Sequence, residues 1–113
     1  MRTIRSSREF DELFREGTRV SHPLVIALIR ATPSGRGPEG RVAFVAGKKL
    51  GGAVHRNRCK RVLRAAARDA GAPWPGMDVI LISRPDTAQA RAGQLKDALS
   101  SIARRLEGPG GRR

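Results

Sequence analysis

The residues with the most distinctive chemistry in this chain are cations, and they gather in one stretch. Positions 48 to 68 hold eight of the 23 lysines and arginines. They are Lys48, Lys49, Arg56, Arg58, Lys60, Arg61, Arg64 and Arg68. No aspartate or glutamate lies anywhere from 40 to 68. Because a guanidinium group can give a phosphate two parallel hydrogen bonds, this stretch predicts binding to a polyanion.

The spacing of these cations predicts a helix with two different faces. At about 100° per residue, one arc carries Cys59, Val62, Leu63, Ala66, Ala67 and Ala70. The opposite arc carries Asn57, Lys60, Arg61, Arg64 and Arg68, with Arg58 at one side and Arg56 near the apolar boundary. A solvated face would mix charges, whereas like charges four residues apart destabilise a helix. The cationic arc is therefore interpreted as a binding face.

The other reactive residues form no catalytic or metal-binding constellation. Cys59 is the only cysteine and there are two histidines, too few for a structural zinc site, and this composition fits a reducing compartment. Cys59 is interpreted as a buried apolar residue, and His55 as a helix-surface histidine that could instead contact phosphate or take up a proton. His22, before Pro23, is expected to be structural. The ten carboxylates are scattered apart from a group on the first predicted helix, so we expect no catalytic residues and no metal ligands.

Around the cationic helix the sequence predicts one small α+β domain. A capping-box pattern at Ser6 and Glu9, with apolar residues at 10, 13 and 14, indicates a first helix that ends near Gly17. Strands are expected at 24–29, 41–46 and 77–82, the first two paired as a hairpin. A last helix is marked by Leu95, Leu99, Ile102 and Leu106. The order is α-β-β-α-β-α around one sheet, with a β-α-β unit from 42 to 82.

Charge and length narrow the class of protein. The net charge of +13 implies a polyanionic partner, nucleic acid in preference to an anionic membrane surface. The longest apolar run, 24–29, is too short to span a membrane, and no signal peptide is recognised, so we expect a cytoplasmic protein. The chain is expected to form one domain over 1–107, followed by a flexible basic tail at 108–113. Trp74, between two prolines, is expected to anchor the linker before the last strand.

One segment resembles a known family. It reads Gly47-Lys-Lys-Leu-Gly-Gly-Ala-Val-His-Arg-Asn-Arg-Cys-Lys-Arg-Val-Leu-Arg64. This is similar to the hallmark of the bacterial ribonuclease P protein subunit, Ser-Lys-Lys-x-Gly-x-Ala-Val-x-Arg-Asn-Arg-x-Lys-Arg-x-x-Arg. The resemblance extends more weakly to Phe10, Phe14, Gly17 and the strand at 78–82. The chain departs from the family pattern at Gly47 (usually Ser), Ala65 (Glu or Gln), Ala67 (an aromatic) and Leu28 (often Tyr).

The resemblance implies a function and a fold. The family is the protein part of a ribonucleoprotein that removes the 5′ leader of precursor tRNA, and its RNA subunit performs the hydrolysis with bound magnesium. The fold it implies is of the αβββαβα type, ribosomal protein S5 domain 2-like. Its β-α-β crossover is left-handed, although such crossovers are right-handed in about 98% of proteins. The implied partners are the catalytic RNA subunit and precursor tRNA, with no membrane and no obligate protein partner.

The resemblance also implies two RNA-binding surfaces. The predicted contacts to the RNA subunit are Lys48, Lys49, Arg56, Asn57, Arg58, Arg61 and Arg68. The predicted cleft for the single-stranded leader is lined by Phe10, Phe14, Ile26, Leu28, Lys60 and Arg64. Core packing of the two phenylalanines is the alternative for those positions. Two other functions stay open: a ribosomal or other structural RNA-binding protein of similar fold, and an enzyme whose own side chains do chemistry.

Overall fold

The computed structural model describes residue 4 and residues 7–32 and 40–107, apart from the side chains of Ala92 and 105–107. The helices of this part are α1 (Ser7–Glu16), α2 (Ala53–Asp69) and α3 (Ala92–Glu107), with short 3₁₀ turns η1 (Lys48–Leu50) and η2 (Thr87–Gln89). The strands are β1 (Thr18–His22), β2 (Val25–Ala31), β3 (Arg41–Val45) and β4 (Met77–Ser83). The predictions for Ser6, for the Leu106 side chain and for the tail lie outside the described residues, as do residues 33–39.

The four strands form one mixed sheet in the order β1-β2-β4-β3. β2 pairs antiparallel with β1 and with β4, and β4 pairs parallel with β3. The predicted hairpin between the strands at 24–29 and 41–46 is therefore wrong, because β4 lies between them. β2 and β4 have more buried residues than β1 and β3, on both faces of the sheet, as expected for strands in central positions.

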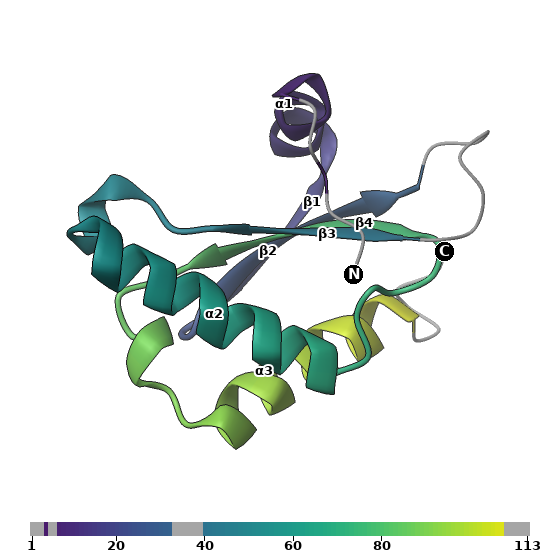
Figure 1. Cartoon of the computed structure of the whole chain (residues 1–113). Helices are drawn as coiled ribbons and strands as arrows, with labels where there is room; N and C mark the ends of the chain where they lie inside the picture. The colour runs from purple at the N-terminus through teal and green to yellow at the C-terminus, as the bar shows by residue number, and fades with distance from the viewer. Residues whose placement is uncertain (1–3, 5–6, 33–39, 108–113) are drawn as a thin grey trace.

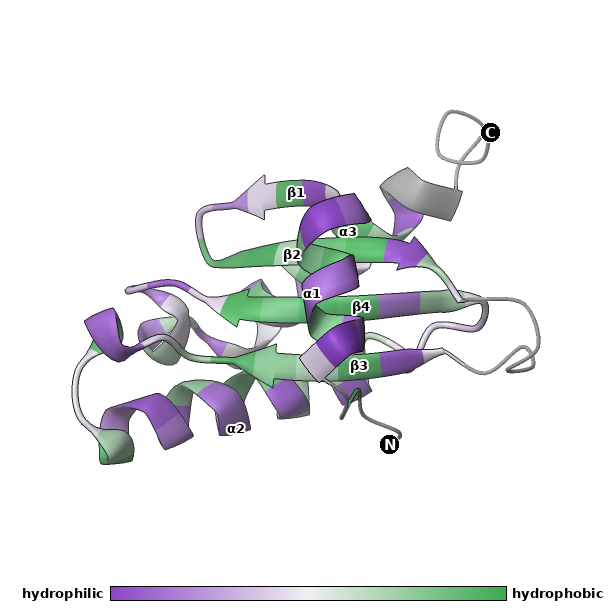
Figure 2. Cartoon of the chain, turned by 90° about the horizontal axis from the view of Figure 1, so that it is seen from above, coloured by the Kyte–Doolittle hydropathy of each residue, from purple (hydrophilic) through white to green (hydrophobic). Residues whose placement is uncertain are grey.

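The β-α-β unit is present and its hand is the unusual one. β3 and β4 are parallel neighbours, joined by α2 on one face of the sheet. Viewed from the opposite face with both strands pointing up, β4 lies to the right of β3 while α2 lies behind them (Figures 1 and 2). The crossover is therefore left-handed, as the family resemblance implied and against the general preference.

Strand β1 was not predicted from the residue pattern. Its five residues are mostly exposed, and only Val20 packs against the main core. A polar strand at the edge of a sheet gives no strong alternation of apolar residues, so its pairing with β2 was not visible in the sequence. The αβββαβα order implied by the family resemblance does include this strand.

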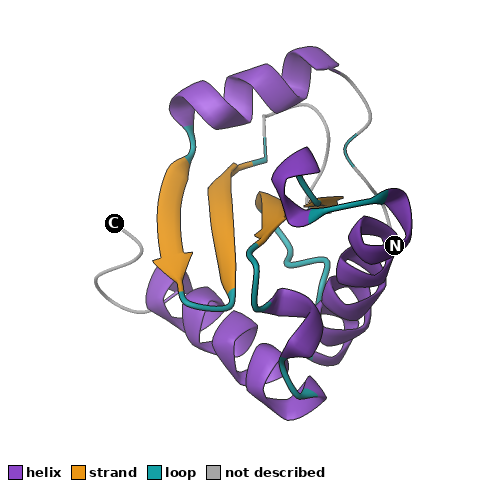
Figure 3. Ribbon diagram, turned by 90° about the vertical axis from the view of Figure 1, so that its left-hand side faces the viewer, coloured by secondary structure: helices purple, strands orange, loops and turns teal. Residues whose placement is uncertain are grey.

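Helices cover both faces of the sheet (Figures 1 and 3). Alternate residues of the central strands point to opposite faces. Val25, Ala27 and Ile29 face α2 and α3 and form the main core with Leu63 and Leu99. On the other face α1 crosses the strands, and a smaller cluster joins Leu13 of α1 to Leu28, Ala43 and Ile80, with Ile4. No helix in the described part of the chain is both long and apolar enough to span a bilayer.

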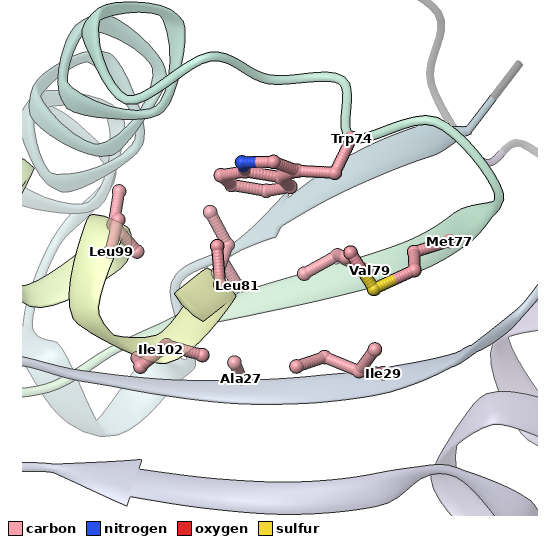
Figure 4. Close-up of a pocket in the computed structure, with 9 residues that line it drawn as sticks. Ala27, Ile29, Trp74, Met77, Val79, Leu81, Leu99 and Ile102 are labelled. Carbon is pink, nitrogen blue, oxygen red and sulfur yellow. The ribbon is translucent and has the colours of Figure 1, made fainter. Parts of the chain in front are cut away.

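Trp74 anchors the linker between α2 and β4, as predicted. Its indole ring closes a small apolar cavity between the sheet and α3 (Figure 4). The ring is buried, and its Nε1–H donates a hydrogen bond of 3.3 Å to the Ala70 carbonyl at the end of α2. The linker is therefore held both by apolar packing and by one polar contact.

Candidate nucleic-acid interface

The turn before α2 presents two lysines to solvent. Lys48 and Lys49 lie in η1 and are exposed. The turn ends at Gly51, whose φ of +119° lies in a region that side chains rarely adopt. Gly52 is the N-cap of α2 and provides no side-chain cap, and the first turn has no acidic residue. Because the positive end of the helix dipole meets cations here, this helix start is suited to a negatively charged partner.

Helix α2 has the two faces that its sequence predicted. Cys59, Leu63, Ala66 and Ala67 are buried, and Val62 and Ala70 pack partly against the core. The solvent side carries the exposed Asn57, Arg58, Arg61, Arg64 and Arg68 together with the half-buried Lys60. We call the five cations among these the basic face of α2. The turn η1, with Lys48 and Lys49, adjoins the N-terminal end of α2.

Two arginines of α2 differ in their surroundings. Arg56 is half-buried, and its Nε is enclosed without a hydrogen-bond partner. The guanidinium of Arg64 lies over the Phe44 ring, with Cζ 5.2 Å from the ring centroid. Such a cation–π contact orients the side chain along the edge strand β3. Arg64 therefore lies on the α2 side of the sheet, away from the α1 side that carries Ile26 and Leu28.

Cys59 and His22 have the structural roles predicted for them, whereas His55 is less exposed than predicted. Cys59 is fully buried, as predicted. His22 is structural, because its Nδ1 accepts a hydrogen bond of 3.1 Å from the Leu24 backbone N–H. His55 is half-buried, with Nε2 3.8 Å from the Cys59 Sγ. His55 therefore faces partly inward instead of standing free on the helix surface.

The predicted leader cleft comes together only in part. Leu28 is 4% exposed and covered by α1, so it has no free surface on which a base could stack. Phe10 packs partly on the same cluster, whereas Phe14 is 53% exposed. Lys60 and Arg64 belong to α2, on the opposite face of the sheet (Figure 3). The burial of Leu28 could not be predicted, because the alternation of a strand shows which residues share a face but not what covers that face.

An open groove lies on the α1 face beyond the part of the sheet that α1 covers. It has a volume of about 760 Å³. Its lining residues come from β2, η1 and the end of β4, and we call it the β2–β4 groove: Ile26, Gly47, Lys48, Lys49, Leu50, Ile82, Ser83, Arg84 and Pro85. Of the predicted cleft residues only Ile26 lines it. Ile82 pairs directly with Ile26 across the strands, so their shared face could be recognised only once the β2–β4 register was known.

A network of ion pairs fastens α1 to the sheet. Arg30 of β2 donates to Glu12 at 3.1 Å, and Arg41 of β3 donates to Glu9. Both arginines also face the buried Asp78 of β4, at 3.9 and 3.6 Å. Burial alone would lower the pKa of Arg41, but the hydrogen bond and charge of Glu9, followed by Asp78, raise it overall. Glu9 and Glu12, two members of the acidic group on the first helix, therefore attach α1 to the sheet.

Comparison with known proteins decides the family. The sequence model of the family described as Ribonuclease P matches residues 1–107. The chain is 34% identical over 116 residues to the ribonuclease P protein component of Streptomyces avermitilis, covering 96% of this chain and 94% of that protein. The chain belongs to the ribonuclease P protein family. Membership makes it a protein component of ribonuclease P, which argues against a ribosomal or other structural RNA-binding role.

Solved structures of ribonuclease P proteins share the fold. The protein from Thermotoga maritima superposes with a TM-score of 0.77 at 25% identity, over 96% of this chain and all 100% of that one. The protein from Staphylococcus aureus gives a TM-score of 0.75 at 21% identity, over 92% of this chain and 94% of that one.

Within the described residues, no group of three or more histidine, cysteine or acidic side chains is placed to hold a metal ion.

Proposed function

We propose that this ribonuclease P component binds the catalytic RNA subunit and the 5′ leader of precursor tRNA, and so promotes 5′ maturation of tRNA in the cytoplasm. The observation that carries the proposal is the basic face of α2, which has no acidic neighbour on its helix before Asp69. Hydrolysis is assigned to the RNA subunit with its bound magnesium. The protein contributes phosphate contacts and positioning.

The basic face of α2 and the η1 lysines suit a structured RNA. Phosphates along an RNA backbone offer a row of negative charges, and Arg58, Arg61 and Arg68 are exposed along one side of the helix to meet them. Asn57, exposed among these cations, adds an amide that can hydrogen-bond a base edge or a ribose hydroxyl. Arg56, half-buried with a free Nε–H, is better suited to positioning this segment than to an independent phosphate contact.

The β2–β4 groove suits a single strand. A single strand shows base faces and phosphates together, so its site needs apolar surface beside cations. Ile26 and Ile82 supply the apolar surface, and Lys48, Lys49 and Arg84 supply the charge. Phe14 adds an exposed aromatic ring on α1, which crosses the same face of the sheet. The two lysines of η1 belong to this groove and also precede α2, so they are placed to contact either RNA.

The test compares precursor tRNA, which carries a leader, with mature tRNA, both bound to the holoenzyme reconstituted with a bacterial ribonuclease P RNA. Phe14→Ala should weaken precursor binding by about tenfold, because stacking of one base on an aromatic ring contributes about 1–3 kcal/mol. Phe14→Leu should lose nearly as much if a flat ring is required. Binding of mature tRNA and of the RNA subunit should stay within about twofold.

The matched control is Phe44→Leu, which removes a ring from the α2 side of the sheet. It should leave the ratio of precursor to mature affinity unchanged. Equal losses for precursor and mature tRNA in a folded Phe14 variant would remove Phe14 from the leader site. A wild-type holoenzyme that binds the two tRNAs equally would contradict the leader-binding function itself.

A further inference from the structure

An ion-pair network beneath α1 can control the proposed leader site. Its members are Glu9, Glu12, Arg30, Arg41 and Asp78. Arg30 and Arg41 are the residues that pair with Asp78 on its two sides, in β2 and β3. The two arginines therefore stand beside one buried carboxylate, and each reaches up to a different carboxylate of α1. Three strands and one helix meet in this network.

The network is largely shielded from water. Asp78 is fully buried, and the Arg30 and Arg41 side chains are 13% and 15% exposed. Ion pairs in such a site are screened little by salt, and removal of one partner leaves a buried charge without compensation. This differs from the Arg15–Glu16 pair of the same helix, which is 3.9 Å long and exposed at both side chains.

The network also determines the rotation of α1 about its axis. Leu13 is the only fully buried residue of α1 and supplies its central apolar contact. Glu9 and Glu12 lie on the same side of Leu13 at helical spacing, and their ion pairs to β3 and β2 hold that side of α1 against the sheet. Phe10 and Phe14, four residues apart, lie together on the neighbouring side of the helix. Their position over the sheet therefore follows from where Glu9 and Glu12 are held.

We infer that Glu9, through its ion pair with Arg41, is a positioning residue for leader binding: it holds α1 at the rotation that places Phe10 and Phe14 beside the β2–β4 groove. The inference rests on the proposed function, since it concerns the same leader site. Glu9 itself touches no RNA. Its carboxylate is neutralised by Arg41, so α1 also presents less negative charge to an incoming phosphate backbone.

Glu9→Gln tests the inference, with Glu16→Gln as its matched control. Each variant removes one carboxylate from α1, so both change the overall attraction to RNA equally, but only the first breaks the network. Glu9→Gln should lower the ratio of precursor to mature tRNA affinity by about fivefold, since small misplacements of binding groups cost affinity. Glu16→Gln should leave the ratio within about 1.5-fold. Affinity for the RNA subunit should be the same in both variants.

Arg41→Gln removes the other partner of the same ion pair, on strand β3. It should give the same loss in the affinity ratio, and the double variant with Glu9→Gln should lose no more than either single variant. Additive losses would show that the two residues act separately and would overturn the inference. If Glu9→Gln does not fold, judged by its thermal unfolding, Glu12→Gln replaces it, because that carboxylate is the more exposed of the two.

The outcomes separate the inference from the function on which it rests. A wild-type protein that distinguishes precursor from mature tRNA, with a folded Glu9→Gln variant that matches Glu16→Gln, would overturn the positioning role and leave leader binding intact. A wild-type protein that shows no preference for precursor would overturn both. Loss of the preference in Glu9→Gln alone, with RNA-subunit affinity retained, supports the positioning role.

Discussion

The basic face of α2 and the η1 lysines should make the affinity for the RNA subunit depend on salt concentration. Six of the eight cations between 48 and 68 are exposed, and Arg56 and Lys60 are half-buried. Each phosphate contact contributes about 0.7–0.9 to the slope of log affinity against log salt. Six contacts therefore predict a slope of about −4 to −5.5, and all eight would extend it to about −7. Between 50 and 200 mM salt, six contacts correspond to an affinity loss of about 300-fold to 2,000-fold.

The assay is the binding of labelled RNA subunit at a series of potassium chloride concentrations, with magnesium held constant. Arg58→Ala and Arg61→Ala should each reduce the magnitude of the slope by about one contact, or 0.7–0.9. Arg15→Ala is the matched control, because Arg15 is exposed on α1, across the sheet from α2. It should leave the slope unchanged and alter the affinity by less than about twofold.

Two results would refute this reasoning. A wild-type slope near zero would show that phosphate neutralisation does not drive binding. An Arg15→Ala variant that lowers the slope as much as Arg61→Ala would show that net charge matters and that the basic face of α2 has no special position.

Three further predictions concern stability and chemistry. Leu63→Ala should destabilise the fold by about 2–5 kcal/mol in urea unfolding, because Leu63 is fully buried between α2 and the sheet. Gly51→Ala should cost about 1–3 kcal/mol in the same measurement, since its backbone conformation is one that almost only glycine adopts; a neutral result would contradict the geometry of the turn before α2. Highly purified protein with magnesium and without the RNA subunit should not cleave precursor tRNA, and protein-dependent cleavage at the mature 5′ end that survives RNase treatment of the preparation would contradict an RNA-based mechanism.

Helix α2 was the element most accessible to prediction from sequence. Its apolar and cationic residues repeat at helical spacing, and the structure places them on opposite faces as the period requires. The strands were recognised where apolar residues run together, as in β2 and β4. The edge strand β1 was missed because Thr18, Arg19 and Ser21 are polar and exposed.

The leader site was harder to predict because it depends on register and coverage. Ile26 and Leu28 lie on the same face of β2, yet α1 covers Leu28 and leaves Ile26 at the groove. Ile82 joins that groove through its pairing with Ile26, a contact between residues far apart in sequence. Arg84 lines the groove because the chain turns after β4, where the Arg84 N–H donates to the Thr87 hydroxyl. None of these relations leaves a local signal in the sequence.

The place of β4 in the sheet has a consequence for how the chain folds. β4 is the last of the four described strands to be synthesised, yet it lies between β2 and β3. Until it is available, β3 has no strand beside it, and the β1–β2 hairpin is the only strand pair that local contacts can form among the described residues. Closing the sheet therefore means bringing distant segments together, a high contact order that slows folding relative to a helical bundle of equal length. On the ribosome, the apolar faces of β2 and β3 stay without their common neighbour until residues 77–83 have emerged.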